Sequence, residues 1–269
     1  MWNDISTFSV LVTGATKGIG LATALAFARL GANVTLTHKW GSVAEEELNE
    51  AFDAVDAKPP LIVRADARSS GDTQALLEAI HARFGRLDVF VSNVSVAQVP
   101  KALDDYTLRG LRASVDYSVW PLIEHVRKSP DVFGAHPRYV IAMSSCGAES
   151  MHTNYDFAGP TKAMLETFCR YLAYRLRADE VRVNAVRTRY IPTKSLVATA
   201  GAEFVDFVEQ VDPSLFVEPS IVADAVVALC SGAMDAVTGQ VLTVDRGTSF
   251  RDNIMGAFER RTTPTANQE

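Results

Sequence analysis

The stretch Val10-Leu11-Val12-Thr13-Gly14-Ala15-Thr16-Lys17-Gly18-Ile19-Gly20 joins a short apolar run to a glycine-rich segment and then to a helical pattern. Its three glycines allow a tight turn and a close approach of a ligand to the backbone. The N-terminus of the following helix then faces a pyrophosphate group. A glycine motif alone is weak evidence, but this one occupies the first strand-to-helix turn of an alternating chain. We therefore predict a dinucleotide site here, in preference to an ordinary glycine-rich loop.

Short apolar runs alternate with helical patterns from one end of the chain to the other. Seven runs have the length and composition of strands: Val10–Val12, Val34–Leu36, Leu61–Val63, Val89–Val91, Tyr139–Ala142, Val183–Val186 and Val241–Val244. Some helical patterns between them end at a glycine, as at Gly31 and Gly85. This alternation predicts an α/β fold, a single Rossmann-type doubly wound parallel sheet of about seven strands with helices on both faces.

The alternation contains no repeat and no low-complexity linker, which predicts one domain over residues 1–250. Residues 194–217 interrupt it with a partly helical insertion that is rich in alanine, phenylalanine and valine. We expect this segment to be a mobile substrate lid. Residues 251–269 are predicted to form a poorly ordered C-terminal tail.

The composition disfavours several classes of partner. A chain of 269 residues with 48% hydrophobic content can bury a sizeable core, and a net charge of −6 argues against nucleic acid. No signal peptide and no membrane-spanning run are visible, so no membrane partner is expected. Three cysteines without a CxxC pair are typical of reduced thiols in a cytoplasmic protein. The five histidines lack metal-ligand spacing, so no metal is predicted.

The end of the second predicted strand indicates which dinucleotide the site takes. NAD enzymes usually have a carboxylate there, which accepts a hydrogen bond from the ribose 2′-hydroxyl. This chain has Thr37-His38-Lys39 instead, and Lys17 lies within the glycine-rich turn. A carboxylate would repel a 2′-phosphate, whereas these side chains can attract one. We therefore predict NADPH, with a merely solvated role as the alternative for the lysines, more so for Lys39.

With these features, the chain resembles a short-chain dehydrogenase/reductase. The resemblance runs from the glycine-rich turn to Thr238–Gly247 near the end of the chain. It implies further cofactor contacts at positions that match the superfamily. Asp66 and Ala67 correspond to residues beside the adenine. Asn93 lies where the superfamily has the sequence NNAG, of which this chain retains only part. Ile191 and Thr193 correspond to residues that touch the nicotinamide carboxamide and the phosphates.

The serine, tyrosine and lysine of the superfamily are present, but with an unusual spacing. In the common pattern the tyrosine lies four positions before the lysine and thirteen after the serine. Ser145 and Lys162 keep this register, whereas Ala158 occupies the tyrosine position and Tyr155 lies three residues earlier. The Tyr-x6-Lys spacing is similar to that of the divergent NADPH-dependent enoyl-acyl carrier protein reductases. The resemblance implies catalytic roles for Ser145, Tyr155 and Lys162.

A displaced tyrosine suits the reduction of a conjugated double bond. Hydride then goes to the β-carbon, two bonds further from the carbonyl oxygen, which becomes an enolate and still needs a hydrogen-bond donor. Pro160 fits the first turn of a helix, so we expect Tyr155 on the loop before it. Lys162 would then lie inside the helix, directed at the nicotinamide ribose, and its charge would lower the pKa of Tyr155.

Several positions depart from the family pattern. Asp116 replaces a relay asparagine, Arg187–Ile191 replaces an Ala-Pro-Gly-Pro-Ile stretch, and Asp245-Arg246-Gly247 replaces Asp-Gly-Gly. These changes argue against a housekeeping role in fatty-acid synthesis and favour a specialised substrate. An irregular carbonyl reductase and a degenerate, non-catalytic NADPH-binding protein remain the alternatives.

The predicted function is NADPH-dependent reduction of the carbon–carbon double bond of an α,β-unsaturated acyl thioester, carried by acyl carrier protein or coenzyme A. Within residues 194–217, Leu196, Val197, Ala198, Phe204 and Phe207 suit an acyl chain. The resemblance also implies a homotetramer or homodimer, with helices near 103–126 and 161–178 at the interface.

Overall fold

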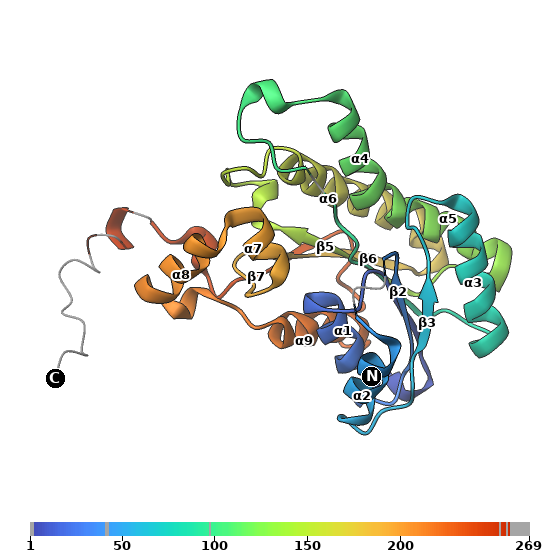
Figure 1. Cartoon of the computed structure of the whole chain (residues 1–269). Helices are drawn as coiled ribbons and strands as arrows, with labels where there is room; N and C mark the ends of the chain where they lie inside the picture. Colours follow the sequence, from blue (N-terminus) through green and yellow to red (C-terminus); the bar gives the residue numbers. More distant parts are fainter. Residues whose placement is uncertain (1–2, 41–42, 97, 253, 257, 259–269) are drawn as a thin grey trace.

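A seven-stranded parallel sheet forms the centre of the computed structural model, which describes residues 3–40, 43–96, 98–252, 254–256 and 258. The strand order is β3-β2-β1-β4-β5-β6-β7, and Figure 1 shows the sheet enclosed by the helices. The strands are β1 (Ser9–Val12), β2 (Asn33–His38), β3 (Leu61–Arg64), β4 (Val89–Ser92), β5 (Tyr139–Ser145), β6 (Arg182–Thr188) and β7 (Val241–Val244). Each includes one of the seven predicted runs, so the predicted fold class is confirmed.

The helices pack on both faces of the sheet. They are α1 (Gly18–Arg29), α2 (Glu45–Asp53), α3 (Ser70–Phe84), α4 (Leu108–Ser118), α5 (Trp120–Phe133), α6 (Ala158–Arg175), α7 (Lys194–Ala200), α8 (Ala202–Val211) and α9 (Pro219–Cys230). Short 3-10 helices span Ile5–Thr7, Leu103–Asp105, Cys146–Ala148, Arg177–Asp179, Pro213–Leu215 and Thr248–Phe250. Helices α1, α2 and α9 contribute to one apolar layer, and α3, α5 and α6 contribute to the other.

Alternation along the strands explains why both faces are apolar. Val10 and Val12 of β1 belong to the layer that contains Phe27 of α1, whereas Leu11 belongs to the layer that contains Phe90. Successive side chains of a strand point to opposite faces, so a continuous apolar run buries both faces at once. All four residues of β1 are buried, which is the environment of a central parallel strand.

Glycines end two of the helices as the sequence predicts. Gly85 caps α3 in the left-handed conformation, with φ of 72°, and Gly31 has φ of 83° two residues after α1. The left-handed conformation costs glycine little because it has no Cβ. Each turn ends its helix and returns the chain toward the sheet, as α1 leads into β2.

The strand order reverses between β1 and β4, and this reversal positions the site. Strand β1 pairs with β2 on one side and with β4 on the other. In open parallel sheets the loops after two such strands diverge, and ligands bind in the crevice outside the carboxyl ends of the strands. The glycine-rich turn follows β1 at this point, and Asn93 follows β4.

The insertion at 194–217 is largely helical, as predicted, and consists of α7, α8 and the 3-10 helix Pro213–Leu215. Helices α7 and α8 pack against each other and are orange in Figure 1. The tail prediction concerns residues 251–269, of which 253, 257 and 259–269 lie outside the described residues. No helix in the described ranges combines the length and the apolar character that crossing a membrane requires.

Candidate active site

One cleft of about 970 Å³ opens at the switch point of the sheet. It brings together the turn after β1, the end of β2, the loop after β4, the segment from β5 to α6 and the segment that follows β6. The predicted site residues that line it are Gly14, Thr16, Lys17, Gly18, Ile19, Gly20, His38, Lys39, Ala67, Asn93, Ser145, Tyr155, Lys162, Ile191 and Thr193. Asp66 does not line it, although both of its neighbours do.

The turn after β1 has the shape of a phosphate cradle. Helix α1 begins at Gly18, and the N-cap residue Lys17 makes no side-chain hydrogen bond to the first turn. The helix therefore presents backbone amides and the positive end of its dipole to the cleft, as anion binding requires. The backbone at Gly14 and Gly18 has φ of 62° and 57°, a region that favours glycine.

Close packing beneath the turn leaves no room for a side chain at Gly20. A Cβ there would lie 2.6 Å from Nδ2 of Asn93 and 2.7 Å from the carbonyl oxygen of Gly14. Asn93 donates from Nδ2 to the carbonyl oxygens of Thr13 and Gly14, at 3.0 Å each. Asn93 thus braces the turn, and the turn fits the pyrophosphate of a dinucleotide.

Beside the end of β2, Lys39 is already paired. Its Nζ lies 2.7 Å from Oδ2 of Asp66 and donates to the Tyr117 hydroxyl at 2.5 Å. Partial burial acts to raise the pKa of Asp66, but hydrogen bonds from Lys39 and Arg68 outweigh it and lower the pKa to about 2. Asp66 was expected beside the adenine, whereas its carboxylate pairs with these two cations. Two cations on one carboxylate leave the cluster with a net positive charge.

The predicted catalytic segment, residues 144–162, places Tyr155 on a turn before α6, as Pro160 led us to expect. Strand β5 ends at Ser145, and α6 begins at Ala158 with Pro160 in its first turn. The Tyr155 ring packs against Gly147, where a Cβ would lie 2.5 Å from two ring carbons. Its hydroxyl shares a hydrogen bond with Ser145. Ala158 is buried at the position where the common pattern has tyrosine.

Burial controls the ionisation of the two titratable groups. It raises the pKa of Tyr155, an effect that the Ser145 hydrogen bond only partly offsets. It lowers the pKa of Lys162 to about 8, although the nearby Glu166 carboxylate acts in the opposite direction. The expectation that Lys162 lowers the pKa of Tyr155 is therefore wrong. Lys162 instead donates from Nζ to the carbonyl oxygen of Met143, at 2.7 Å.

A buried ionic network that the sequence analysis missed supports this segment. Glu166, one turn after Lys162 on α6, accepts hydrogen bonds from the Ser144 hydroxyl at 2.6 Å and from Arg187 at 2.7 and 3.0 Å. Arg187 also lies 2.5 Å from Glu149. These hydrogen bonds raise the pKa of Arg187. The i,i+4 spacing of Lys162 and Glu166 was the available signal, because such residues share one helix face.

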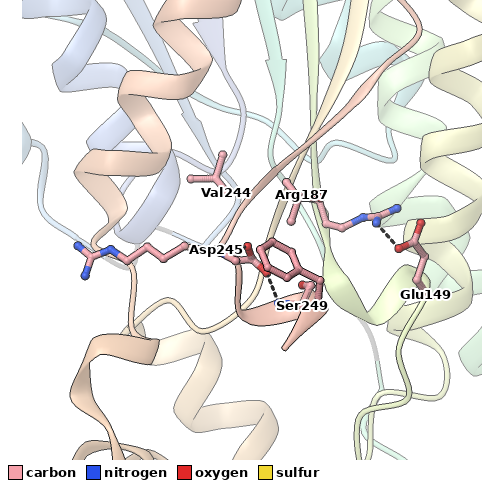
Figure 2. Close-up of a pocket in the computed structure, with 9 residues that line it drawn as sticks. Glu149, Arg187, Val244, Asp245 and Ser249 are labelled. Carbon is pink, nitrogen blue, oxygen red and sulfur yellow. Dashed lines mark hydrogen bonds and ion pairs between the residues drawn. The ribbon is translucent and has the colours of Figure 1, made fainter. Parts of the chain in front are cut away.

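The two departures at Arg187 and Asp245–Gly247 meet in a second hollow of about 570 Å³. Figure 2 shows Arg187 facing Glu149 there, and Asp245 accepting a hydrogen bond from the Ser249 backbone amide at 2.7 Å. Arg187 lines this hollow, whereas Ser144 lines the main cleft. Glu166 accepts hydrogen bonds from both Ser144 and Arg187, so it connects the walls of the two cavities.

Aromatic side chains line the cleft near Tyr155. The ring of His152 lies 5.9 Å from that of Tyr155 and 6.5 Å from that of Tyr190, which in turn lies 5.6 Å from Phe204 on α8.

Of the residues expected to contact an acyl chain, Leu196 and Phe204 line the cleft. Val197, Ala198 and Phe207 are exposed and do not line it. Asp116 is also exposed and does not line the cleft.

Comparisons with known proteins agree with this arrangement. Residues 14–249 match the family model described as enoyl-(acyl carrier protein) reductase. The chain is 28% identical over 263 residues to the NADH-dependent enoyl-[acyl-carrier-protein] reductase FabI of Aquifex aeolicus, covering 93% of each chain. It is 30% identical over 251 residues to the 1-cyclohexenylcarbonyl-CoA reductase of Streptomyces collinus, covering 89% of this chain and 86% of that one.

Its fold is similar to that of a 7α-hydroxysteroid dehydrogenase complexed with NADH and 7-oxo glycochenodeoxycholic acid. The TM-score is 0.80 at 24% identity, with 92% of this chain and 98% of the other covered. The match to the family model covers most of the chain. The protein therefore belongs to the short-chain dehydrogenases/reductases, in the family that the enoyl-(acyl carrier protein) reductase model describes, and is an oxidoreductase with a nicotinamide-cofactor site.

Proposed function

We propose that the protein uses NADPH to reduce the carbon–carbon double bond of an α,β-unsaturated acyl thioester. The position of Tyr155 carries this proposal. Its ring is fixed on the turn before α6 by Gly147, and its hydroxyl is paired with Ser145. Ala158 occupies the position where the common superfamily pattern has its tyrosine, and it offers no hydroxyl.

The chemistry requires a donor at the thioester oxygen, away from the carbon that is reduced. The nicotinamide, when bound, would supply hydride to the β-carbon, and the α-carbon of the resulting enolate would take a proton from solvent water. As the carbonyl becomes an enolate, a hydrogen bond to its oxygen strengthens and stabilises the transition state. Burial raises the pKa of Tyr155 and so keeps its hydroxyl protonated at neutral pH, ready to donate. Ser145 orients this hydroxyl, and Lys162 is assigned to the cofactor ribose.

Charges around the 2′-phosphate position favour NADPH. Lys17 is exposed at the glycine-rich turn, and Lys39 and Arg68 share one carboxylate, that of Asp66. The end of β2 carries no carboxylate of its own, since its last residues are Thr37 and His38. The enoyl reductase of Aquifex aeolicus is named for NADH, so the proposed preference for NADPH would distinguish this protein from that relative.

We assign residues 194–217 to a substrate lid. Leu196 and Phe204 line the cleft from α7 and α8, and most of the side chains of these two helices are exposed. Segments with few buried contacts open most easily. Hydrogen exchange in α7 and α8 should slow when NADPH and an acyl thioester bind. Unchanged exchange with both ligands bound would contradict the assignment.

A homo-oligomer, dimer or tetramer, would cover the apolar surface of α4 and α6. Tyr171 and Tyr174 on α6 are 65% and 67% exposed, and Leu108 on α4 is 62% exposed. Large exposed apolar groups on adjacent helices are typical of protein interfaces. Light scattering should give a mass above that of a monomer, and Tyr171→Glu with Tyr174→Glu should lower it. We also place the protein in the cytoplasm, where its three buried cysteines stay as free thiols.

The proposed reaction is tested with two short substrates. NADPH oxidation is followed with a crotonyl thioester and with an acetoacetyl thioester, each on coenzyme A and on acyl carrier protein. Faster turnover of the crotonyl group supports enoyl reduction in fatty-acid, polyketide or more specialised metabolism. Turnover of acetoacetyl alone would identify a carbonyl reductase. Tight NADPH binding without turnover of either, or of longer enoyl chains, would identify a nucleotide-binding protein.

A further inference from the structure

Two arginines follow each other closely near the end of β6, and their surroundings differ. Arg187 is paired with the carboxylates of Glu166 and Glu149. Arg189 is partly buried, yet in the described part of the chain it forms no ion pair with a carboxylate. One Nη of Arg189 donates to the carbonyl oxygen of Thr248, and its guanidinium lies over the Tyr190 ring at 5.1 Å. Its Nε is buried without a hydrogen-bond acceptor.

His152 has a similar unpaired atom at the same end of the cleft. Its Nε2 is buried and has no hydrogen-bond partner, and its ring contacts the rings of both Tyr155 and Tyr190. Burial lowers the pKa of His152, and the charge of Arg189 lowers it further, so the ring is neutral at pH 7. We assign the hydrogen of the neutral ring to Nε2, which makes this nitrogen a donor, like Nε of Arg189. Both residues line the cleft.

The free-energy cost of burying these N–H groups without acceptors indicates the kind of ligand that would bind to them. A partly buried guanidinium that faces no carboxylate, and a buried N–H without an acceptor, are each unfavourable until a partner binds. Two donors need acceptor oxygens, and a guanidinium favours a carboxylate.

The cofactor phosphates are not this partner, because the cradle that fits them is at Gly14–Gly20. Arg189 instead lies close enough to Cys146, which directly follows Ser145, for its charge to act on the pKa of that thiol, in the lowering direction.

We propose that Arg189 and His152 form a subsite for a carboxylate on the acyl part of the substrate. The inference rests on the proposed enoyl reduction and names its substrate class, a thioester of an unsaturated dicarboxylic acid. The thioester oxygen lies at Tyr155, and the distal carboxylate binds Arg189 and His152 beyond it. The Arg187–Ile191 departure from the family pattern then has a role in substrate recognition.

A matched substrate pair tests this subsite. Crotonyl-CoA and its 4-carboxy derivative, glutaconyl-CoA, differ only by one carboxylate at the end of the acyl chain. Charge-assisted hydrogen bonds predict a kcat/KM about 10- to 100-fold higher for glutaconyl-CoA. Arg189→Gln should bring the ratio of the two kcat/KM values close to one, and His152→Leu should lower it by a smaller factor. Arg246→Gln removes an exposed arginine outside the cleft and should leave the ratio unchanged.

A ratio near one in the wild type would overturn the subsite while leaving enoyl reduction intact. An equal loss with both substrates in Arg189→Gln would overturn it too, because the residue would then serve the shared thioester. Binding of butyryl-CoA and glutaryl-CoA with oxidised cofactor, measured by calorimetry, needs no turnover. Tighter binding of glutaryl-CoA supports the subsite even if neither enoyl is reduced, and equal binding contradicts it. NADPH affinity of each variant shows that it is folded.

Discussion

The glycine-rich turn (residues 13–20) and the catalytic segment (residues 144–162) line the same cleft but are built differently. The turn relies on shape, because backbone atoms and one brace, Asn93, leave no space for an added carbon at Gly20. The catalytic segment relies on side chains held from outside it by the buried carboxylate of Glu166. An added carbon atom in the turn should therefore weaken cofactor binding. The catalytic segment should be sensitive to an added atom as well, and also to the loss of a buried charge.

Glu166→Gln should produce the largest change in stability. The substitution leaves Arg187 buried with only the exposed Glu149 as a charged partner. Breaking a buried pair on one side typically costs about 3–5 kcal/mol of unfolding free energy. Urea unfolding measures this loss. Glu78→Gln on the exposed face of α3 is the control and should stay within about 0.5 kcal/mol of the wild type. A similarly small loss for Glu166→Gln would show that the network does not support the segment.

Lys162 should make stability depend on pH. Burial lowers its pKa in the folded state from 10.5 to about 8. Between these pH values the unfolded chain holds the proton that the folded chain has lost, so stability rises with pH in this window. The rise due to this group amounts to about 3 kcal/mol. Urea unfolding of the wild type and of Lys162→Met over this window should show it in the wild type alone. Equal slopes for the two proteins would contradict the buried lysine.

Gly147→Ala should damage the catalytic segment without touching the turn. The added carbon meets the Tyr155 ring at 2.5 Å and must displace it. Misplacing a catalytic group by about 1 Å can cost about 10²-fold in rate. We expect such a loss of kcat for the enoyl thioester, with cofactor affinity retained. Gly71→Ala, where the nearest atom is 3.8 Å away, is the matched control. Normal turnover by Gly147→Ala would mean that the Tyr155 ring is not fixed there.

Gly20→Ala should instead weaken cofactor binding and leave the catalytic segment in place. Its Cβ meets backbone atoms of the turn, which cannot give way as a flexible side chain can. Overpacking of this kind costs about 1–3 kcal/mol. We expect that cost to appear as weaker cofactor binding in a fluorescence titration, while circular dichroism stays that of a folded protein. Unchanged cofactor affinity would remove the phosphate cradle from the account.

Cofactor preference is the smallest expected effect. NADPH should bind about tenfold or more tightly than NADH, since each charge-assisted contact contributes ~1–3 kcal/mol. Lys17→Ala should reduce this preference in the same titration. If the preference survives intact, it belongs to His38 or Lys39. Equal affinities of the wild type for both cofactors would contradict the 2′-phosphate site itself.

The sequence predicted the features that depend on neighbours along the chain. The strands follow from short apolar runs, and the turn after β1 follows from Gly14, Gly18 and Gly20. Tyr155 could be placed before α6 because Pro160 marks the first turn of that helix. Each of these inferences uses residues that are close together in the sequence, and local geometry constrains them strongly.

Features that depend on tertiary contacts could not be predicted in this way. Arg187 of β6 reaches Glu166 of α6, and Lys39 after β2 pairs with Asp66 after the neighbouring strand β3. The pKa of Tyr155 is raised mainly by burial, and the expected lowering by Lys162 is not found. A helix pattern also does not specify how α7 and α8 are rotated over the cleft, so the sequence could not show that Phe204 lines it while Phe207 lies exposed.

The most direct test of the central claim is the rate of enoyl reduction by Tyr155→Phe. Its kcat with a crotonyl thioester and NADPH is compared with that of the wild type, with Tyr171→Phe as control, a conservative change on α6 outside the cleft. Losing a hydrogen bond that forms fully in the transition state costs ~2.7–4 kcal/mol, or about 10²–10³ in rate. We predict that loss at unchanged NADPH affinity. Full enoyl reduction by Tyr155→Phe would contradict the displaced-tyrosine mechanism.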